Sequence, residues 1–268
     1  MYWMNLLRPA KAACVTGFLL FQSDASAQEA PTPDPIAAEQ QEPPDLKGTW
    51  YLRMRTAMDA RVAIIGTTHI KSTTHLLVNI EKRDDTYFQS QKTCIVDTRP
   101  SRKLTRTILP EVFIKHLAEK TYPIRVTFSD TGTWEYYADL RQQYVGYRSE
   151  LAPDGIPKSK KHPAVYDWDE DGKPGASVLV HIPIIGFIEI YIVQTNHTFL
   201  NGNIVDENNV EGRTHQRLLL QRTIGAENRL LAASPDLAVA KGHDAFEMVR
   251  IEAGSTCADI KRIAGQSF

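Results

Sequence analysis

The sequence predicts a mostly β protein, built as a single closed or nearly closed antiparallel β-barrel with two short helices. Three observations predict this fold. Apolar and polar side chains alternate along many short segments, as in 75–81, where Leu76, Val78 and Ile80 point to one side. Turn signals such as Asp-Thr-Gly at 130–132 separate these segments. About 220 residues from Asp45 onward suit one large β domain, with a two-sheet sandwich as the second choice.

The alternating segments predict roughly nine or ten strands. Pro110 predicts the start of a first helix, which holds Phe113 and Leu117 at helical spacing. A second short helix is expected after the cap candidate Ser255, with Cys257 and Ile260 on one side. The expected strands lie near 49–56, 75–81, 86–96, 123–129, 134–148, 176–182, 187–193, 198–205 and 213–222.

The N-terminal residues predict export. A basic start, an apolar run over 12–21 and the triplet Ala-Ser-Ala at 25–27 are typical of a signal peptide covering 1–27. The segment 28–44 is rich in proline and acidic residues, which predicts a disordered tether before the domain at 45–268. We therefore expect a periplasmic or extracellular protein, with no integral membrane segment after cleavage of the signal.

The apolar run over 175–193 is better explained by a core hairpin than by a membrane span. It contains Pro183 and Gly186, which would bracket the turn or a bulge, and it alternates at Ile188, Ile190 and Ile192. The formal net charge of the chain is −1 at pH 7, so no general attraction to nucleic acid is implied.

Two cysteines, Cys94 and Cys257, follow the predicted cleavage site. In an oxidising compartment a disulfide between them is expected, which would connect the C-terminal segment to the middle of the domain. The alternative is a pair of buried free thiols.

The acidic loop at 167–175 predicts a calcium site, because carboxylates at alternate positions followed by glycine can wrap a hard cation. Position twelve of an EF-hand order is Val178, so the bidentate glutamate is missing and affinity should be weak, about 10⁻⁴ to 10⁻³ M. The alternative is an acidic turn without a cation. The predicted ligands are Asp167, Asp169, Asp171, the carbonyl of Lys173 and Ser177.

Catalytic signatures are not evident. The sequence has no Gly-x-Ser-x-Gly elbow, no phosphate-binding glycine loop and no dinucleotide fingerprint. Glu135 or Asp139 could face Glu189 across a cavity, but a β domain of this size offers many such pairs. No enzyme activity is therefore predicted.

Aromatic side chains crowd two expected strands, at 134–137 and 144–147. They would either line an apolar pocket or fill the core. The pocket candidates from the residues themselves are Trp134, Tyr136, Tyr144 and Ile190.

The segment Gly48-Thr49-Trp50 resembles the Gly-x-Trp opening strand of lipocalin-like (calycin) β-barrels. The resemblance implies that Trp50 closes one barrel end and that an arginine from a late strand, Arg222 or Arg217, packs over it. It therefore adds Trp50 and Arg222 to the pocket candidates. The chain also resembles a group of secreted proteobacterial proteins with an Asp-rich Gly-x-Pro-Gly loop, a resemblance that implies no chemistry.

Three hypotheses follow. The first is a secreted or periplasmic, non-enzymatic β-barrel that binds a small, partly apolar molecule and is stabilised by calcium and a disulfide. The second is a calcium-stabilised surface or interaction module with a filled core, and the third is a hydrolase or isomerase built in the barrel mouth. An internal cavity separates the first two, because Tyr136, Tyr144 and Ile190 line it in one case and plug it in the other.

Overall fold

A computed structural model of the chain describes residues 42–62, 66–101, 106–182, 186–227 and 236–266. The predicted signal peptide lies outside these ranges, and so does the predicted tether except for its last three residues. Export and cleavage therefore stay predictions. Pro183, expected at the hairpin turn, also lies outside the described residues.

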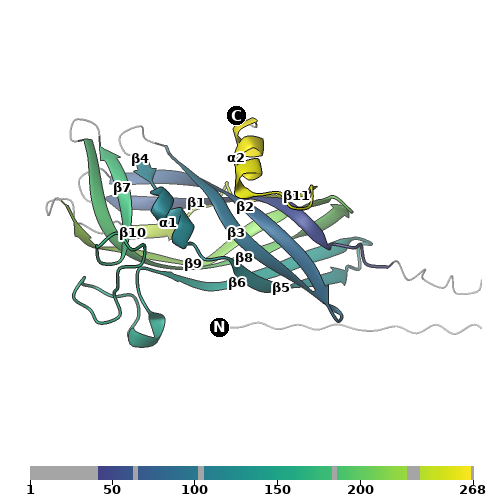
Figure 1. Ribbon diagram of the computed structural model, residues 1–268, viewed down its shortest axis with the longest axis horizontal. Helices are drawn as coiled ribbons and strands as arrows, with labels where there is room; N and C mark the ends of the chain where they lie inside the picture. Colours follow the sequence, from purple (N-terminus) through teal and green to yellow (C-terminus); the bar gives the residue numbers. More distant parts are fainter. Residues whose placement is uncertain (1–41, 63–65, 102–105, 183–185, 228–235, 267–268) are drawn as a thin grey trace, which may run out of the picture. The chain divides into compact units, whose positions relative to one another are not determined.

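Strands make up most of the described chain, as predicted from the alternation (Figure 1). Within the described ranges, neither α-helix has the length and apolar composition that crossing a bilayer requires. The α-helices are α1 (Glu111–His116) and α2 (Cys257–Gln266), and a single 3-10 turn covers Ser149–Leu151. The strands are β1 (Gly48–Val62), β2 (Gly66–Arg83), β3 (Thr86–Pro100), β4 (Arg106–Ile108), β5 (Lys120–Phe128), β6 (Trp134–Val145), β7 (Ala176–Ile182), β8 (Gly186–Asp206), β9 (Asn209–Ala226), β10 (Asp236–Val239) and β11 (Phe246–Ile251).

The strands form one antiparallel sheet whose pairings return to their starting point. Following hydrogen-bonded neighbours from β8 leads through β6, β5, β3, β2, β1, β11 and β9 and back to β8. Four of the eight links in this ring join strands that follow each other in the chain: β1–β2, β2–β3, β5–β6 and β8–β9. The additional strands β7, β4 and β10 attach to β8, β7 and β1 respectively. The predicted mostly β sheet with two helices is confirmed, and so is the core hairpin, formed by β7 and β8.

Strand length decides where the ring can hold a site. β5 pairs with β3 only from Tyr87 to Gln91, so the last nine residues of β3 have no β5 partner. The helix α1 lies beside β3 and β7 in this region (Figure 1). The short strand β4 pairs with β7 in the same region. It also contacts β3, because the Thr98 hydroxyl on β3 donates a hydrogen bond to the carbonyl of Thr107 on β4 at 2.7 Å. One part of the wall is therefore built from side chains and a helix instead of paired backbone.

The other half of the ring interior is filled. Its core includes Trp50, whose indole N–H donates to the Leu46 carbonyl at 2.9 Å. Because inward-facing side chains from opposite strands meet there, this half has a continuous apolar core. The buried members are Leu46, Trp50, Leu52, Leu76, Val78, Ile80, Tyr87, Tyr122, Ile124, Tyr136, Ala138, Leu140, Leu200, Ile204, Val210, Phe246 and Met248.

An arginine does lie over Trp50, but it is neither of the two expected ones. The guanidinium carbon of Arg250, on β11, is 4.3 Å from the centre of the Trp50 ring. The same guanidinium donates to the carbonyls of Asp45, Lys47 and Glu207, which ties the segment before β1 to the turn between β8 and β9. Arg250 was missed because β11 carries only six residues and was not predicted as a strand.

The helix α2 packs on the outside of the ring, against β2 and β3. Cys94 and Cys257 are disulfide-bonded with Cα atoms 5.2 Å apart, so the predicted bridge is confirmed and the alternative of free thiols is wrong. The helix begins one residue later than Ser255 would place it: Thr256 donates its N–H and its hydroxyl to Asp259, each at 2.9 Å. The Asp259 carboxylate thus accepts from the N–H of the cap residue, which is one half of a capping box.

Candidate ligand cavity and metal centre

A cavity of about 620 Å³ occupies the part of the ring that the apolar core leaves open. This volume lies within the range of small-molecule pockets, roughly 300 to 1,000 Å³. Its walls come from the strands β1 to β10 and from the helix α1. Because side chains alternate across a strand, every second residue of β2 faces it, for example Ile70, Ser72 and Thr74.

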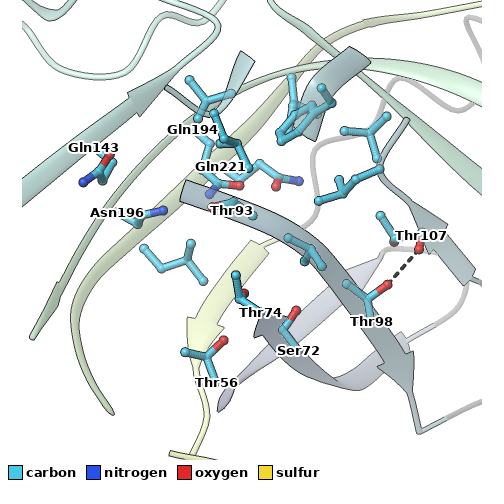
Figure 2. Close-up of a pocket in the computed structure, with 18 of the residues that line it drawn as sticks. Thr56, Ser72, Thr74, Thr93, Thr98, Thr107, Gln143, Gln194, Asn196 and Gln221 are labelled. Atoms are coloured by element: carbon cyan, nitrogen blue, oxygen red, sulfur yellow. Dashed lines mark hydrogen bonds between the residues drawn. The ribbon is translucent and has the colours of Figure 1, made fainter. Parts of the chain in front are cut away.

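The cavity lining combines aliphatic side chains with uncharged polar groups. Figure 2 shows the hydroxyls of Thr56, Ser72 and Thr74 on one side and carboxamides such as Gln143 and Gln194 toward the other. Among the described residues that line it, none is an aspartate or a glutamate. The carboxamides are Gln91, Gln143, Gln194, Asn196, Gln216 and Gln221, and the hydroxyl residues other than tyrosine are Thr56, Thr68, Ser72, Thr74, Thr93, Thr98, Thr107, Thr198 and Thr223.

Only part of the predicted pocket belongs to the cavity. Tyr144 and Ile190 line it. Trp50 and Tyr136 are fully buried in the filled half, and Trp134 packs partly buried against the same core. Large aromatic side chains therefore fill one half of the ring, which is the second of the two alternatives that the aromatic clusters left open.

Arg222 is also absent from the lining, although it belongs to β9, which contributes other wall residues. The polar wall residues were missed by the sequence reasoning. The sequence does contain a signal for them: Gln194, Asn196 and Thr198 continue the alternate positions of β8 that Ile188, Ile190 and Ile192 occupy. Amides and hydroxyls on an inward face have no reason to be there in a solid core.

The acidic loop brings the three predicted aspartates together. One oxygen from each of Asp167, Asp169 and Asp171 lies within 4.8 Å of the others, so the cluster could hold a metal ion. The loop is closed by the Asp167 carboxylate, which accepts hydrogen bonds from the N–H groups of Asp171 at 3.1 Å and Gly172 at 2.8 Å. Gly172 has a φ of 83°, which favours glycine at this turn.

Asp169 is the unusual member of the cluster, because it is fully buried. Its Oδ2 accepts a hydrogen bond from the Ser177 N–H at 2.9 Å, while its Oδ1 has no partner among the described residues. The Ser177 hydroxyl, also buried, likewise has none. Burial raises the pKa of the Asp169 carboxyl, and the nearby Asp171 carboxylate adds to the effect. A cation would compensate the buried charge and use both idle oxygens.

The side chain of Lys173 is anchored by two residues of β8. Its ammonium lies 2.7 Å from Glu189 Oε2 and over the Tyr191 ring, and the hydrogen bond to Glu189 raises the pKa of Lys173. Its N–H donates to Asp171 Oδ1 at 2.8 Å. The role predicted for the Lys173 carbonyl stays a prediction.

The acidic loop and the cavity share a wall. Trp168, between two of the aspartates, lines the cavity and packs on Phe113 of α1 with ring centres 5.0 Å apart. Glu170, two residues after Trp168, has Oε2 3.7 Å from His116 Nε2, and His116 also lines the cavity. A cation bound by the loop would therefore fix residues that contact a ligand.

The carboxylates considered for catalysis have other partners. Asp139 lies 2.7 Å from His197, and Glu189 binds Lys173. Neither carboxylate, nor Glu135, lines the cavity. The geometry gives these residues no common reaction site.

Comparisons of the chain with protein-family models, with curated proteins and with solved structures found no match. The functional argument therefore depends on the cavity and the acidic loop.

Proposed function

We propose that this chain is an exported carrier of small, partly apolar molecules. The ring of eight strands would form a lipocalin-like barrel, with the ligand inside. The observation that carries this proposal is the cavity of about 620 Å³, which Tyr144 and Ile190 line. An interaction module with a filled core would not contain an interior space of this size, because an empty cavity lowers the stability of the fold.

The chemistry of the cavity supports a partly apolar ligand. Aliphatic residues such as Val180, Ile188 and Leu219 offer surface that gains free energy when a ligand displaces water from it. The amides and hydroxyls then fix the ligand's orientation through a few hydrogen bonds. At the opposite end, the core around Trp50 and the Arg250 contacts would close the barrel.

Calcium is the cation we propose for the acidic loop. Its preferred ligands are oxygens, and Asp167, Asp169, Asp171 and Ser177 would supply them. Val178, at the position of the missing bidentate glutamate, is buried within β7 and offers no ligand atom. Weak binding suited to an extracellular calcium concentration follows, and the ion would stabilise the cavity wall through Trp168.

Export is part of the proposal. The signal peptide predicted from the sequence would direct the domain out of the cytoplasm, and the disulfide between Cys94 and Cys257 supports export because oxidising compartments favour such bonds. A periplasmic and an extracellular carrier fit equally well.

The second candidate function is an interaction module that works through its surface. The observation that favours it is the filled half of the ring, where Tyr136 and Trp50 leave no room for a ligand. A ligand-binding measurement separates the two candidates, because the module needs no access to the interior.

The test is titration with N-phenyl-1-naphthylamine, an uncharged probe that fluoresces in apolar surroundings. We expect one site per chain in the wild type and at least about a tenfold loss of affinity in Thr74→Trp, which fills the cavity. Thr73→Trp is the matched control, because Thr73 is the neighbour on the same strand and does not line the cavity. Equal binding by both variants, or none by the wild type, would contradict the carrier proposal.

A further inference from the structure

Lys120 stands out among the residues that line the cavity. It is the first residue of β5, and its half-buried ammonium donates a hydrogen bond to the Gln143 side-chain oxygen. In the described part of the chain no carboxylate lines the cavity or forms an ion pair with it. Burial lowers the pKa of Lys120, and no neighbouring acid opposes that effect. Among the described residues the Lys120 ammonium therefore has a neutral hydrogen-bond acceptor, Gln143, but no carboxylate to compensate its charge.

A second donor lies beside it. Gln91 on β3 is the register partner of Lys120 on β5, so the two side chains lie next to each other on the inner face. Gln91 is 7 % exposed, and its amide nitrogen has no hydrogen-bond partner in the described structure. Gln143 is fixed in its orientation, because its own amide nitrogen donates to the Leu140 carbonyl at 2.7 Å and to the Tyr122 hydroxyl. The site thus presents unused N–H donors and an ammonium.

The position of this group sets the direction of a ligand. Tyr122 and Leu140 belong both to the apolar core and to the cavity lining, so Lys120 lies where the filled half meets the cavity. An acceptor group bound there would be at the inner end of the cavity. The rest of the ligand would extend along aliphatic wall residues such as Val180 and Ile188.

We propose that Lys120 and Gln91 bind the carboxylate of an amphipathic carboxylic acid whose apolar part occupies the cavity. This inference rests on the proposed carrier function and names its ligand class. A carboxylate has only acceptor atoms, which match the unused donors, and its charge compensates the ammonium. An uncharged ligand of the same shape would leave the charge uncompensated.

The experiment compares dodecanoate with 1-dodecanol as competitors of N-phenyl-1-naphthylamine at pH 7. The wild type should bind the acid about tenfold more tightly than the alcohol, the value expected for one partly solvated charge-assisted hydrogen bond. Lys120→Met should lose this preference and keep its affinity for the alcohol. Lys92→Met, which removes an exposed lysine from the adjacent strand β3, is the control and should behave like the wild type.

The outcomes separate this inference from the carrier proposal. If the wild type binds acid and alcohol equally, or Lys120→Met retains the preference, the carboxylate site is wrong while the carrier proposal stands. If neither competitor displaces the probe, or the probe does not bind, both are wrong. Should Lys120→Met fail to fold, Gln91→Leu provides the same test, because it must weaken binding of the acid severalfold and leave the alcohol unaffected.

Discussion

Adding calcium to the chelated protein should stabilise it by a predictable amount. The proposed calcium site has three carboxylates and no bidentate glutamate, which predicts a dissociation constant of about 10⁻⁴ to 10⁻³ M. At about 10 mM calcium, an ion that binds only the folded state then contributes about 1.4 to 2.7 kcal/mol to the free energy of unfolding. Urea denaturation followed by tryptophan fluorescence measures this difference, and Trp168 should report the ion directly because it lies between Asp167 and Asp169 in the chain.

The variant Asp169→Asn tests whether the stabilisation by calcium depends on the buried carboxylate. In chelator it should be at least as stable as the wild type, because the substitution removes a buried charge and retains an oxygen for the Ser177 N–H. Adding calcium should raise the free energy of unfolding of this variant only slightly. Asp154→Asn, in an exposed turn, is the control and should respond like the wild type. A wild type that calcium leaves unchanged, or an Asp169→Asn protein that responds fully, would refute the reasoning.

Three further predictions concern stability. Replacing Cys94 and Cys257 by alanine should lower the free energy of unfolding by about 2 to 5 kcal/mol, the upper value reflecting the 163-residue separation, and a loss below about 1 kcal/mol in urea denaturation would be inconsistent with it. Burial and the Arg53 charge lower the pKa of His75 against the opposing effect of Asp97, so the folded state resists its protonation. The free energy of unfolding should therefore fall as the pH drops below 6.5, the pKa of the histidine in the unfolded chain. Thermal unfolding measured from pH 8 to pH 5 should show a smaller loss of stability in His75→Gln, and the same loss as the wild type in the control His215→Gln. Arg250→Ala should cost about 2 kcal/mol through its contacts with Trp50 and three carbonyls, whereas Arg222→Ala should cost less than about 0.5 kcal/mol; equal costs in urea denaturation would contradict the assignment of Arg250.

Long, strongly alternating strands could be predicted from the sequence, because each buries one face. The segment predicted at 86–96 is part of β3, and the one at 176–182 coincides with β7. β8 was expected as two strands, but it is continuous from Gly186 to Asp206, since nothing in 194–197 stops it from pairing with β9. The short strands β4, β10 and β11 were missed, because three to six residues carry too little alternation to stand out.

The two candidate sites differ in how far apart their residues lie in the sequence. The three aspartates follow each other within five residues, so their clustering could be predicted from spacing alone. The cavity depends on where β5 begins relative to β3 and on which half of the ring Trp50 and Tyr136 fill. These are long-range consequences of strand register. For the same reason, the proximity of Gln91 to Lys120 appears only once the strands are paired.

Native mass spectrometry of the mature protein, purified from a periplasm, tests the central claim that the ring encloses a small-molecule site. The wild type should carry a co-purifying molecule of small mass, which is released on denaturation and replaced when N-phenyl-1-naphthylamine is added. The Thr74→Trp protein, prepared in parallel, should carry neither, while Thr73→Trp should match the wild type. A wild-type protein that carries no molecule and takes up no probe would contradict the account.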